Sequence, residues 1–381
     1  MNDGTVHKLY DAPGCRPNPA QALLLKAACT PANVACDFWK QWRAENELAS
    51  SGAASVRLLP WIYLRREELG VSAEDASALE SLYRFAWMTN QRFTNSALTV
   101  LETLEHHHIP VLLLKGLPLL VEAYKDIGGR YMEDFDIMLH EEDVERAVAA
   151  LAEFGWEPTR TSAFSEPARR WRHSEEVRHV SGPSCDIHWR LLCRPNEPVD
   201  EEPLWASCRT ILLRDRPVLT LSPEHMLVHG LVHGFSWERI PAIRWILDTH
   251  LLLRRHTPNW RHVVAEAARR EVTLLVADAI AVYDEILPGE IPAQVRRDLV
   301  EQPVSDKQRR AREQLTGPYE SASLRMVWDL YLSDWSRACF LKEVPRGLRG
   351  FLQHFKIYWR VRSLFAIPLK FLMKILSRAK R

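Results

Sequence analysis

Two aspartates one residue apart suggest chemistry in this sequence. Asp134 and Asp136 lie within the stretch GGRYMEDFDIML, where an apolar run predicts a strand. Side chains at positions i and i+2 of a strand face the same side, so both carboxylates are expected to project together while Phe135 points into the core. Paired carboxylates suit Mg²⁺ or Mn²⁺ bound together with substrate phosphates. The pair therefore predicts a divalent metal site.

A third acid lies in CDIHW, where the same alternation puts Asp186 and His188 on one face of a strand. If this strand adjoins the first, three carboxylates converge. That is the minimum set for two-metal phosphoryl transfer, in which the metals lie about 4 Å apart. Asp134, Asp136 and Asp186 are thus the predicted metal ligands and catalytic residues. His188 is expected either to orient a phosphate or shuttle a proton, or to be a hydrogen-bonded structural histidine.

Residues for holding phosphate precede the acids. In LLLKG a predicted strand ends at Lys115, Gly116 permits close backbone approach, and a helix follows at once. Lys115 and Arg130 add positive charge, and the Arg130 guanidinium matches phosphate oxygens. These features predict a nucleotide-binding turn formed by Lys115, Gly116 and Arg130, with His188 nearby. The alternative is that both cations pair with acids of the chain.

The elements that position these residues predict an α+β fold. Short apolar runs at VLLLKG and FDIML indicate buried strands, and VRHVSGPSCDIHWRLL reads as two strands joined by a turn. Helical periodicity covers the chain on both sides, including a long helix that starts at Ser72. We expect a mixed sheet core between helical regions. The expected regions are 1–108 (helical), 109–200 (core), 201–300 (helical, closing the cleft), 301–343 (helical extension) and 344–381 (tail).

Composition is that of a globular protein, with 381 residues, 46% hydrophobic and 26% charged. Seven cysteines are scattered without a CxxC pair, which argues against a disulfide framework or a structural zinc site. The N-terminus lacks the pattern of a signal peptide, and no apolar run reaches ~18 residues. A cytoplasmic location is therefore expected.

Other polar groups recur in the later helices. His225, His229 and His233 repeat every four residues, a spacing that we interpret as a partly polar face turned toward the cleft rather than a zinc site. Arg244 and Asp248 share one helical turn and are expected to lock the helical region onto the core.

The C-terminal tail carries its own charge pattern. From Val344 onward it holds ten Lys or Arg and no acid, which leaves 40 basic and 49 acidic residues before it, a net charge of −9. Aromatic residues interleave with these cations, as in a basic amphipathic helix that binds an anionic membrane surface at its inner face. Packing of the tail on the acidic body is the equal alternative. Nucleic acid is an unlikely partner, because the body would repel phosphates.

The ordered blocks LLLKG, GGRYMEDFDIML, CDIHWRL and SPEHMLVHGLVHG resemble the uncharacterised nucleotidyltransferase family of the DNA polymerase β-like superfamily. The resemblance implies a mixed sheet flanked by helices, and transfer of NMP from an NTP such as ATP to an acceptor hydroxyl. Gly116 matches the superfamily's glycine turn, Asp134 and Asp136 its metal pair, and Asp186 its third carboxylate. Leu117 stands where the superfamily has Gly or Ser, and Lys115 is expected to compensate.

Members of this family occur in bacterial gene neighbourhoods for exopolysaccharides and lasso peptides. The acceptor implied is therefore a sugar, a lipid-linked glycan, a peptide or a protein. Two alternatives stay open at this point: phosphate transfer by the same site, and a catalytically relict scaffold that binds nucleotide.

Overall fold

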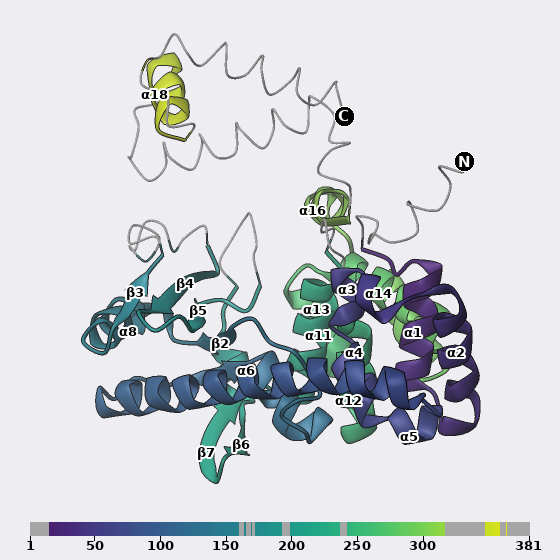
Figure 1. The fold of residues 1–381 in the computed structure, drawn as a ribbon. Coiled ribbons are helices and arrows are strands. Elements are labelled where there is room, and N and C mark those ends of the chain that lie inside the picture. The colour runs from purple at the N-terminus through teal and green to yellow at the C-terminus, as the bar shows by residue number, and fades with distance from the viewer. Residues whose placement is uncertain are drawn as a thin grey trace.

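The computed structural model describes most of the chain, and its labels are used below (Figure 1). The residues described are 15–159, 164, 169, 172–192, 199–236, 242–316, 347–358 and 363.

Helices form the N-terminal region, as the sequence predicts. The longest is α6, which begins after Ser72, whose side chain accepts a hydrogen bond from the Asp75 amide. Their bounds are α1 Pro19–Cys29, α2 Ala32–Glu45, η2 Leu48–Ser50, α3 Ala53–Val56, α4 Leu59–Leu64, α5 Arg66–Leu69 and α6 Ala73–His106.

A seven-stranded mixed sheet confirms the α+β fold. Its strand order is β3-β4-β5-β2-β1-β7-β6. β2 runs parallel to β5 and antiparallel to β1. The bounds are β1 Leu112–Leu114, β2 Phe135–Met138, β3 Trp156–Pro158, β4 Ser174–His179, β5 Ser184–His188, β6 Arg209–Leu213 and β7 Arg216–Thr220. The predicted strands at VLLLKG, FDIML and CDIH are present, and β4 and β5 form the predicted antiparallel hairpin.

The sheet extends past residue 200, the expected end of the core. β6 and β7 form an antiparallel hairpin, and β7 pairs in parallel with β1. Residues 209–220 therefore belong to the sheet and not to the helical region. The turn between the two strands is Arg214-Asp215, both at positive φ, so it lacks the glycine or asparagine that usually marks such a hairpin.

Short helical elements connect the strands. α7 begins directly after Lys115, as predicted, but it is only one turn long and continues as a π-helical turn. α8 has an apolar face, on which Val144, Ala147 and Leu151 are buried. The bounds are α7 Gly116–Leu119, η3 Leu120–Tyr124, η4 Glu141–Asp143, α8 Val144–Ala152 and α10 Glu202–Ala206.

The chain is helical again after β7, beginning at Pro223, with Ser222 as the N-cap. α11, α12 and α14 pack with α1 into a bundle beside the sheet (Figure 1). The bounds are α11 Pro223–Gly234, α12 Arg244–Arg255, α13 Trp260–Arg269, α14 Thr273–Ile286, α15 Ala293–Glu301 and α16 Asp306–Thr316.

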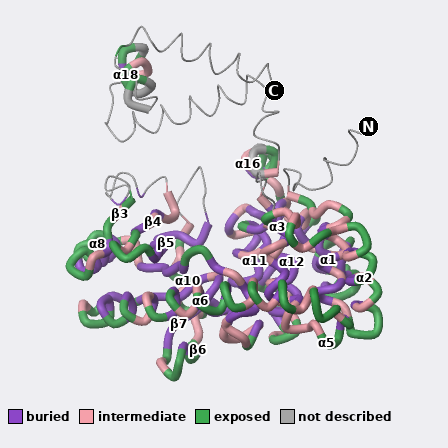
Figure 2. The backbone as a smooth tube through the Cα atoms, viewed as in Figure 1, coloured by how far each residue is buried: buried purple, intermediate pink, exposed green. Residues whose placement is uncertain are grey.

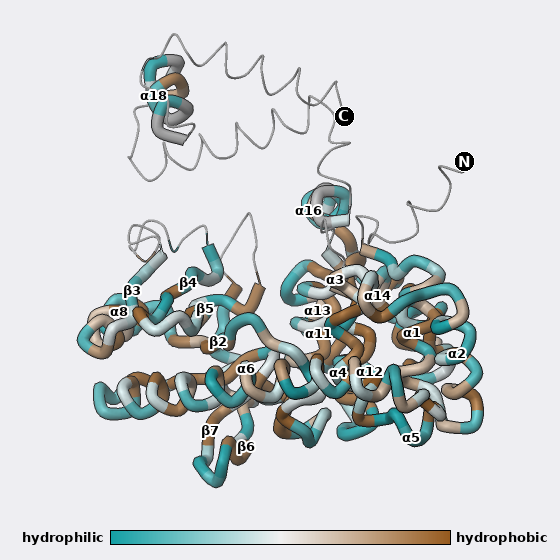
Figure 3. The backbone as a smooth tube through the Cα atoms, viewed as in Figure 1, coloured by the Kyte–Doolittle hydropathy of each residue, from teal (hydrophilic) through white to brown (hydrophobic). Residues whose placement is uncertain are grey.

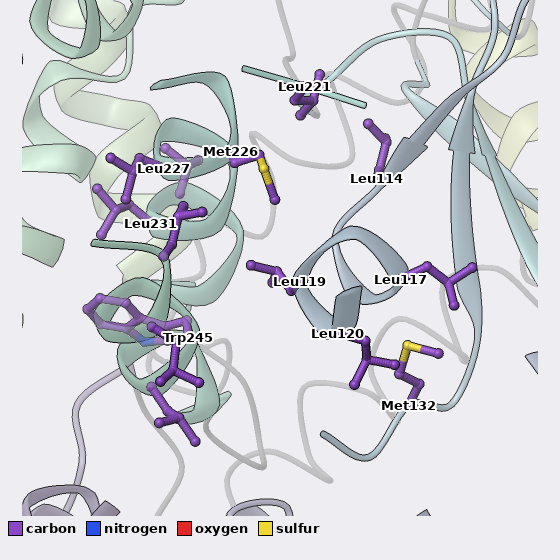
Figure 4. Packing of buried hydrophobic residues seen from close by; sticks show 14 of the residues in the cluster. Leu114, Leu117, Leu119, Leu120, Met132, Leu221, Met226, Leu227, Leu231 and Trp245 are labelled. Carbon is purple, nitrogen blue, oxygen red and sulfur yellow. The ribbon is translucent and has the colours of Figure 1, made fainter. Parts of the chain in front are cut away.

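Sheet and bundle share one apolar core. Buried residues are concentrated in the strands and in the inward sides of the bundle helices (Figure 2). In the close view, Leu119 of α7 lies between the strand that holds Leu114 and the helix that holds Leu227 and Leu231 (Figure 4). Because these side chains exclude water together, α7 and α11 are held at a fixed separation at the edge of the site described below.

α6 contacts both halves of the protein. It packs against α4 on the bundle side and against α8 on the sheet side, and it runs alongside both (Figure 1). Its buried face includes Ala86, Phe93, Ala97 and Leu104. One continuous helix therefore joins the two halves.

The predicted tail falls mostly outside the described residues. Its described part contains α18 (Leu348–Tyr358), which agrees with the predicted helix there. α16 is strongly hydrophilic, in contrast to the apolar helices of the bundle (Figure 3). Within the described part of the chain, no helix is both long enough and apolar enough to cross a bilayer.

Candidate functional site

Asp136 and Asp186 face each other across neighbouring strands. β2 and β5 are parallel, and their register pairs Asp136 with Asp186 and Met138 with His188. Residues paired in this way point to the same side of a sheet. One ligand atom each from Asp136, Asp186 and His188 lies within 4.8 Å of the other two. The structure thus brings together two of the three predicted acids, with His188 between them.

Asp134 precedes β2 by one residue and lines the same cavity as Asp136 and Asp186. Asp134 is exposed to solvent at the cavity wall, but partial desolvation of its carboxylate there, followed by the charge of Asp136, raises its pKa to about 6. The pKa of Asp186 is also raised, chiefly by burial and against the opposing charge of His188. Desolvation is the main cause of both shifts, and the charge of Asp136 adds to each of them, a repulsion that a divalent cation would relieve.

Lys115 supplies a cation within this cluster. Leu114 lies opposite Asp136 in the β1–β2 register, so the next residue reaches the acid. Lys115 Nζ donates to Asp136 Oδ1 at 2.6 Å and lies 3.5 Å from His188 Nε2. Burial alone would raise the pKa of Asp136, but Lys115 and His188 lower it overall. Asp136 is therefore an ionised carboxylate in a buried position.

The Lys115 backbone has φ +48° and ψ −109°, a conformation that a residue with a Cβ adopts at a cost. Such strain persists only where the surroundings enforce it, and it is concentrated at functional sites. Here the β1 pairing before Lys115 and the buried α7 turn after it supply the constraint.

Gly116 lines the cavity, as predicted for the phosphate-binding turn. A Cβ on Gly116 would come within 2.4 Å of Met132 Sδ and 3.2 Å of Arg130 Nη1. The glycine therefore permits the close approach of the β1–β2 connection to the turn. Leu117, which stands where Gly or Ser was expected, is fully buried, and its side chain packs in the core.

Arg130 is committed to an ion pair with the bundle. Its Nε and Nη2 donate to the two carboxylate oxygens of Asp248 on α12, both at 3.0 Å. The Tyr124 hydroxyl donates to Asp248 Oδ1 at 2.7 Å. Burial by itself raises the pKa of Asp248, but Arg130 and Arg244 lower it overall. Asp248 was expected to pair with Arg244 and to hold the helical region on the core. In the structure it bonds to Arg130 and Tyr124 of the core, so Arg130, predicted to bind phosphate, makes the ion pair that joins the two regions.

Histidines of β5 and α11 lie on the Lys115 side of the site: His188, described above, and two residues of α11. His229 and His233 of α11 line the cavity, whereas His225 turns away to pair with Glu266, its Nε2 3.3 Å from the carboxylate. The charge of Lys115 and then burial lower the pKa of His233 to about 3, and burial lowers the pKa of His229 well below its ordinary value. Both imidazoles are neutral at physiological pH and can accept or donate a hydrogen bond.

The cavity that joins these residues has a volume of about 340 Å³, within the usual range for a small-molecule site. Its polar lining comes from the strand ends, the β1–β2 connection and the helices α11 and α12. Its apolar lining includes Leu119, Met226, Leu227 and Trp245. Arg57, Arg244 and Asp248 also line it, and no local pattern in the sequence marked them as site residues.

The donor set fits a divalent cation of the Mg²⁺ or Mn²⁺ type. Asp136 and Asp186 offer hard carboxylate oxygens at the same side of the sheet, and Asp134 adds a third at the cavity wall. His188 Nδ1 is buried without a hydrogen-bond partner among the described residues. These residues can hold a metal ion on the cavity side of β2 and β5.

Comparison with known proteins gives a sequence match and two structural similarities. A family model described as an uncharacterised nucleotidyltransferase matches residues 47–288. No curated protein matches the chain significantly. A solution structure of the antibiotic-resistance factor ANT(2'')-Ia is similar at 13% identity and a TM-score of 0.32, covering 52% of this chain and 96% of that one. An antigenic nucleotidyltransferase-like protein from Paracoccidioides brasiliensis is similar at 12% sequence identity and a TM-score of 0.33. This match covers 59% of this chain and 95% of that one. The family match, which covers more than half of the chain, confirms the resemblance seen in the sequence.

Proposed function

The chain belongs to the uncharacterised nucleotidyltransferase family, and we propose that it moves an NMP from an NTP to an acceptor hydroxyl with the help of Mg²⁺ or Mn²⁺. The observation that carries the proposal is the in-register pairing of Asp136 with Asp186 on adjacent parallel strands, beside Asp134 and a cavity of about 340 Å³. Lys115 pairs with Asp136, whereas no Lys or Arg of the described residues forms an ion pair with Asp134 or Asp186.

In this proposal Asp134, Asp136 and Asp186 hold the metal. A bound divalent cation would neutralise phosphate charge and orient the α-phosphate for in-line attack. Lys115 and the backbone at Gly116 lie on the same cavity wall and contact the phosphates, and His188 keeps Asp136 in position through the 3.2 Å contact of its Nε2 with Oδ1.

Asp186 is the proposed proton acceptor. Its carboxylate lines the cavity beside the other two proposed metal ligands, where an acceptor hydroxyl would approach the α-phosphate. As the acceptor oxygen bonds to the α-phosphorus, the bond to the β-phosphate breaks and pyrophosphate leaves. The hydroxyl proton passes to a carboxylate oxygen of Asp186 and then to solvent.

The test is transfer of α-labelled NTPs to candidate sugar, glycan, peptide and protein acceptors. We expect Asp136→Asn to lower turnover about a hundredfold or more, because it removes a carboxylate that holds the catalytic metal ion. Asp143→Asn is the matched control, since Asp143 is a buried acid paired with Arg146 at 2.6 Å and does not line the cavity. Full turnover by Asp136→Asn would refute the assignment. An acceptor mass increased by phosphate rather than NMP would instead identify a phosphotransferase.

A catalytically inert nucleotide-binding scaffold is the second candidate. The observation that favours it is the Lys115–Asp136 ion pair, because a cation of the chain already occupies the side of Asp136 where a metal would bind. Calorimetry of NTP binding with and without Mg²⁺ separates the two. An enzyme should show metal-dependent heat, and a scaffold should bind with the same heat in both conditions.

We also propose that the tail, residues 344–381, attaches the protein to an anionic membrane surface, which would place it in the cytoplasm at the inner face. Support comes from ten basic residues without an acid and from the α18 helix. A chain ending at Glu343 should no longer sediment with anionic lipid vesicles, while the full chain should do so less at high salt. Undiminished vesicle binding by the shortened chain would favour packing of the tail on the body.

A further inference from the structure

Four Lys or Arg side chains line the cavity, and three of them have a carboxylate within hydrogen-bond distance. Lys115 pairs with Asp136, Arg130 with Asp248, and Arg57 with Glu133, the last at 2.8 Å. Arg244, at the start of α12, is the fourth. The two cations that the sequence assigns to phosphate are therefore already engaged within the chain.

Arg244 has few hydrogen bonds for a half-buried guanidinium. Its Nη1 donates to the backbone carbonyl of Tyr131. Its Nε is buried and has no hydrogen-bond partner in the part of the chain that the structure describes. The nearest carboxylate oxygen, Asp248 Oδ2, is 4.0 Å away, beyond hydrogen-bond reach.

Asp248 cannot serve Arg244 as well. Its Oδ1 accepts from Arg130 Nε and the Tyr124 hydroxyl, and its Oδ2 accepts from Arg130 Nη2. Two guanidinium groups thus share one carboxylate at the cavity wall. Burial and the charge of Arg130 lower the pKa of Arg244 to about 10, so it stays protonated at neutral pH. A desolvated charge that must share its counter-ion with a second cation is costly, and an anion entering the cavity would reduce that cost.

We propose that Arg244 binds the triphosphate of the donor nucleotide, in addition to Lys115 and the Gly116 turn. This inference rests on the proposed function, because it assigns the anion to an NTP. The planar guanidinium has free donors that match phosphate oxygens. Arg244 lines the same cavity as Asp134, Asp136 and Asp186, so a phosphate chain bound there is enclosed together with the proposed metal ligands.

The test is calorimetry of NTP with MgCl₂, and of inorganic tripolyphosphate, with the full chain. We expect Arg244→Gln and Arg244→Met to bind both ligands about tenfold more weakly or worse, the effect of losing a charge-assisted hydrogen bond. Glutamine keeps a polar amide donor but not the charge, so that variant separates loss of the charge from loss of a polar group, whereas methionine removes both. Arg244→Lys should recover part of the affinity.

Arg43→Met is the matched control, because Arg43 forms a two-bond pair with Asp75 and does not line the cavity. It should bind as the unaltered chain does. A folded Arg244→Gln with unchanged affinity for both ligands would overturn the inference and would place the Arg244 charge on an acceptor or in a purely structural role. If the unaltered chain bound no NTP in the presence of Mg²⁺, the proposed function itself would fail, and this inference with it.

Discussion

Lys115 Nζ lies 2.6 Å from Asp136 Oδ1, so a cation of the chain itself neutralises the most buried acid of the candidate site. Asp136 is only 4% exposed, and its lowered pKa follows from this contact together with His188. A divalent ion that binds Asp136 must therefore compete with the Lys115 ammonium. The same competition would free Lys115 to meet the phosphates.

Removing the Lys115 charge should tighten metal binding. We expect Lys115→Met to bind Mn²⁺ about tenfold more tightly in the absence of nucleotide, because one ion pair at Asp136 no longer has to be displaced. Paramagnetic relaxation of water protons by Mn²⁺ measures this directly. Lys40→Met, on the exposed face of α2, should leave the affinity unchanged. Weaker Mn²⁺ binding by Lys115→Met would show that Lys115 supports the site rather than competing for it.

Breaking the Arg130–Asp248 pair should destabilise the fold. Asp248→Asn leaves two cavity-facing guanidinium groups without a carboxylate, and removal of one partner from a buried pair costs about 3–5 kcal/mol of unfolding free energy. Urea denaturation gives this quantity. Asp278→Asn breaks the more exposed pair with Arg312 and should cost about 1 kcal/mol or less. Equal effects of the two substitutions would contradict the locking role of Asp248.

Acid should weaken the bundle through Glu266. Burial by itself raises the pKa of Glu266, but hydrogen bonds from His225 and Arg269 and the charge of Arg270 lower it below the ordinary value of 4.5. A carboxyl with a depressed folded pKa contributes stability that is complete above the unfolded pKa and is lost as pH falls through the folded pKa. The stability lost on Glu266→Gln should therefore be large at pH 7 and shrink below about pH 4.5.

Denaturant midpoints between pH 7 and pH 3 test this dependence. Glu285→Gln is the control, because Glu285 forms an exposed pair with Arg16 and should give a small effect at every pH. A difference between Glu266→Gln and the unaltered chain that stays constant down to pH 3 would argue against a depressed Glu266 pKa.

The strands beside the site could be predicted because their signals are local. β1 and β2 are short apolar runs, and alternation in CDIH is enough to place Asp186 and His188 on one face. The β6–β7 hairpin was missed because its turn, Arg214-Asp215, adopts positive φ at both residues without a glycine or asparagine to mark it. Pairing with β1, about 100 residues earlier, compensates for that turn.

The partners of the site's cations could not be predicted, because they are distant in sequence. Arg130 and Asp248 are 118 residues apart, and no periodicity links them. The stripe His225, His229 and His233 shows the same limit. Its spacing indicates one helical face, but only the packing of α13 decides that His225 turns to Glu266 while the other two reach the cavity. Local pattern therefore predicted which side chains were available, and tertiary pairing decided their use.

Helix α6 gives the site a property that no single contact provides. Its 34 residues form a rod on the order of 50 Å long, which would have to bend before the sheet and the bundle could move apart. Folding therefore places the acids of the sheet and the guanidinium group of the bundle in advance. The entropy of arranging them is not lost again each time a substrate binds.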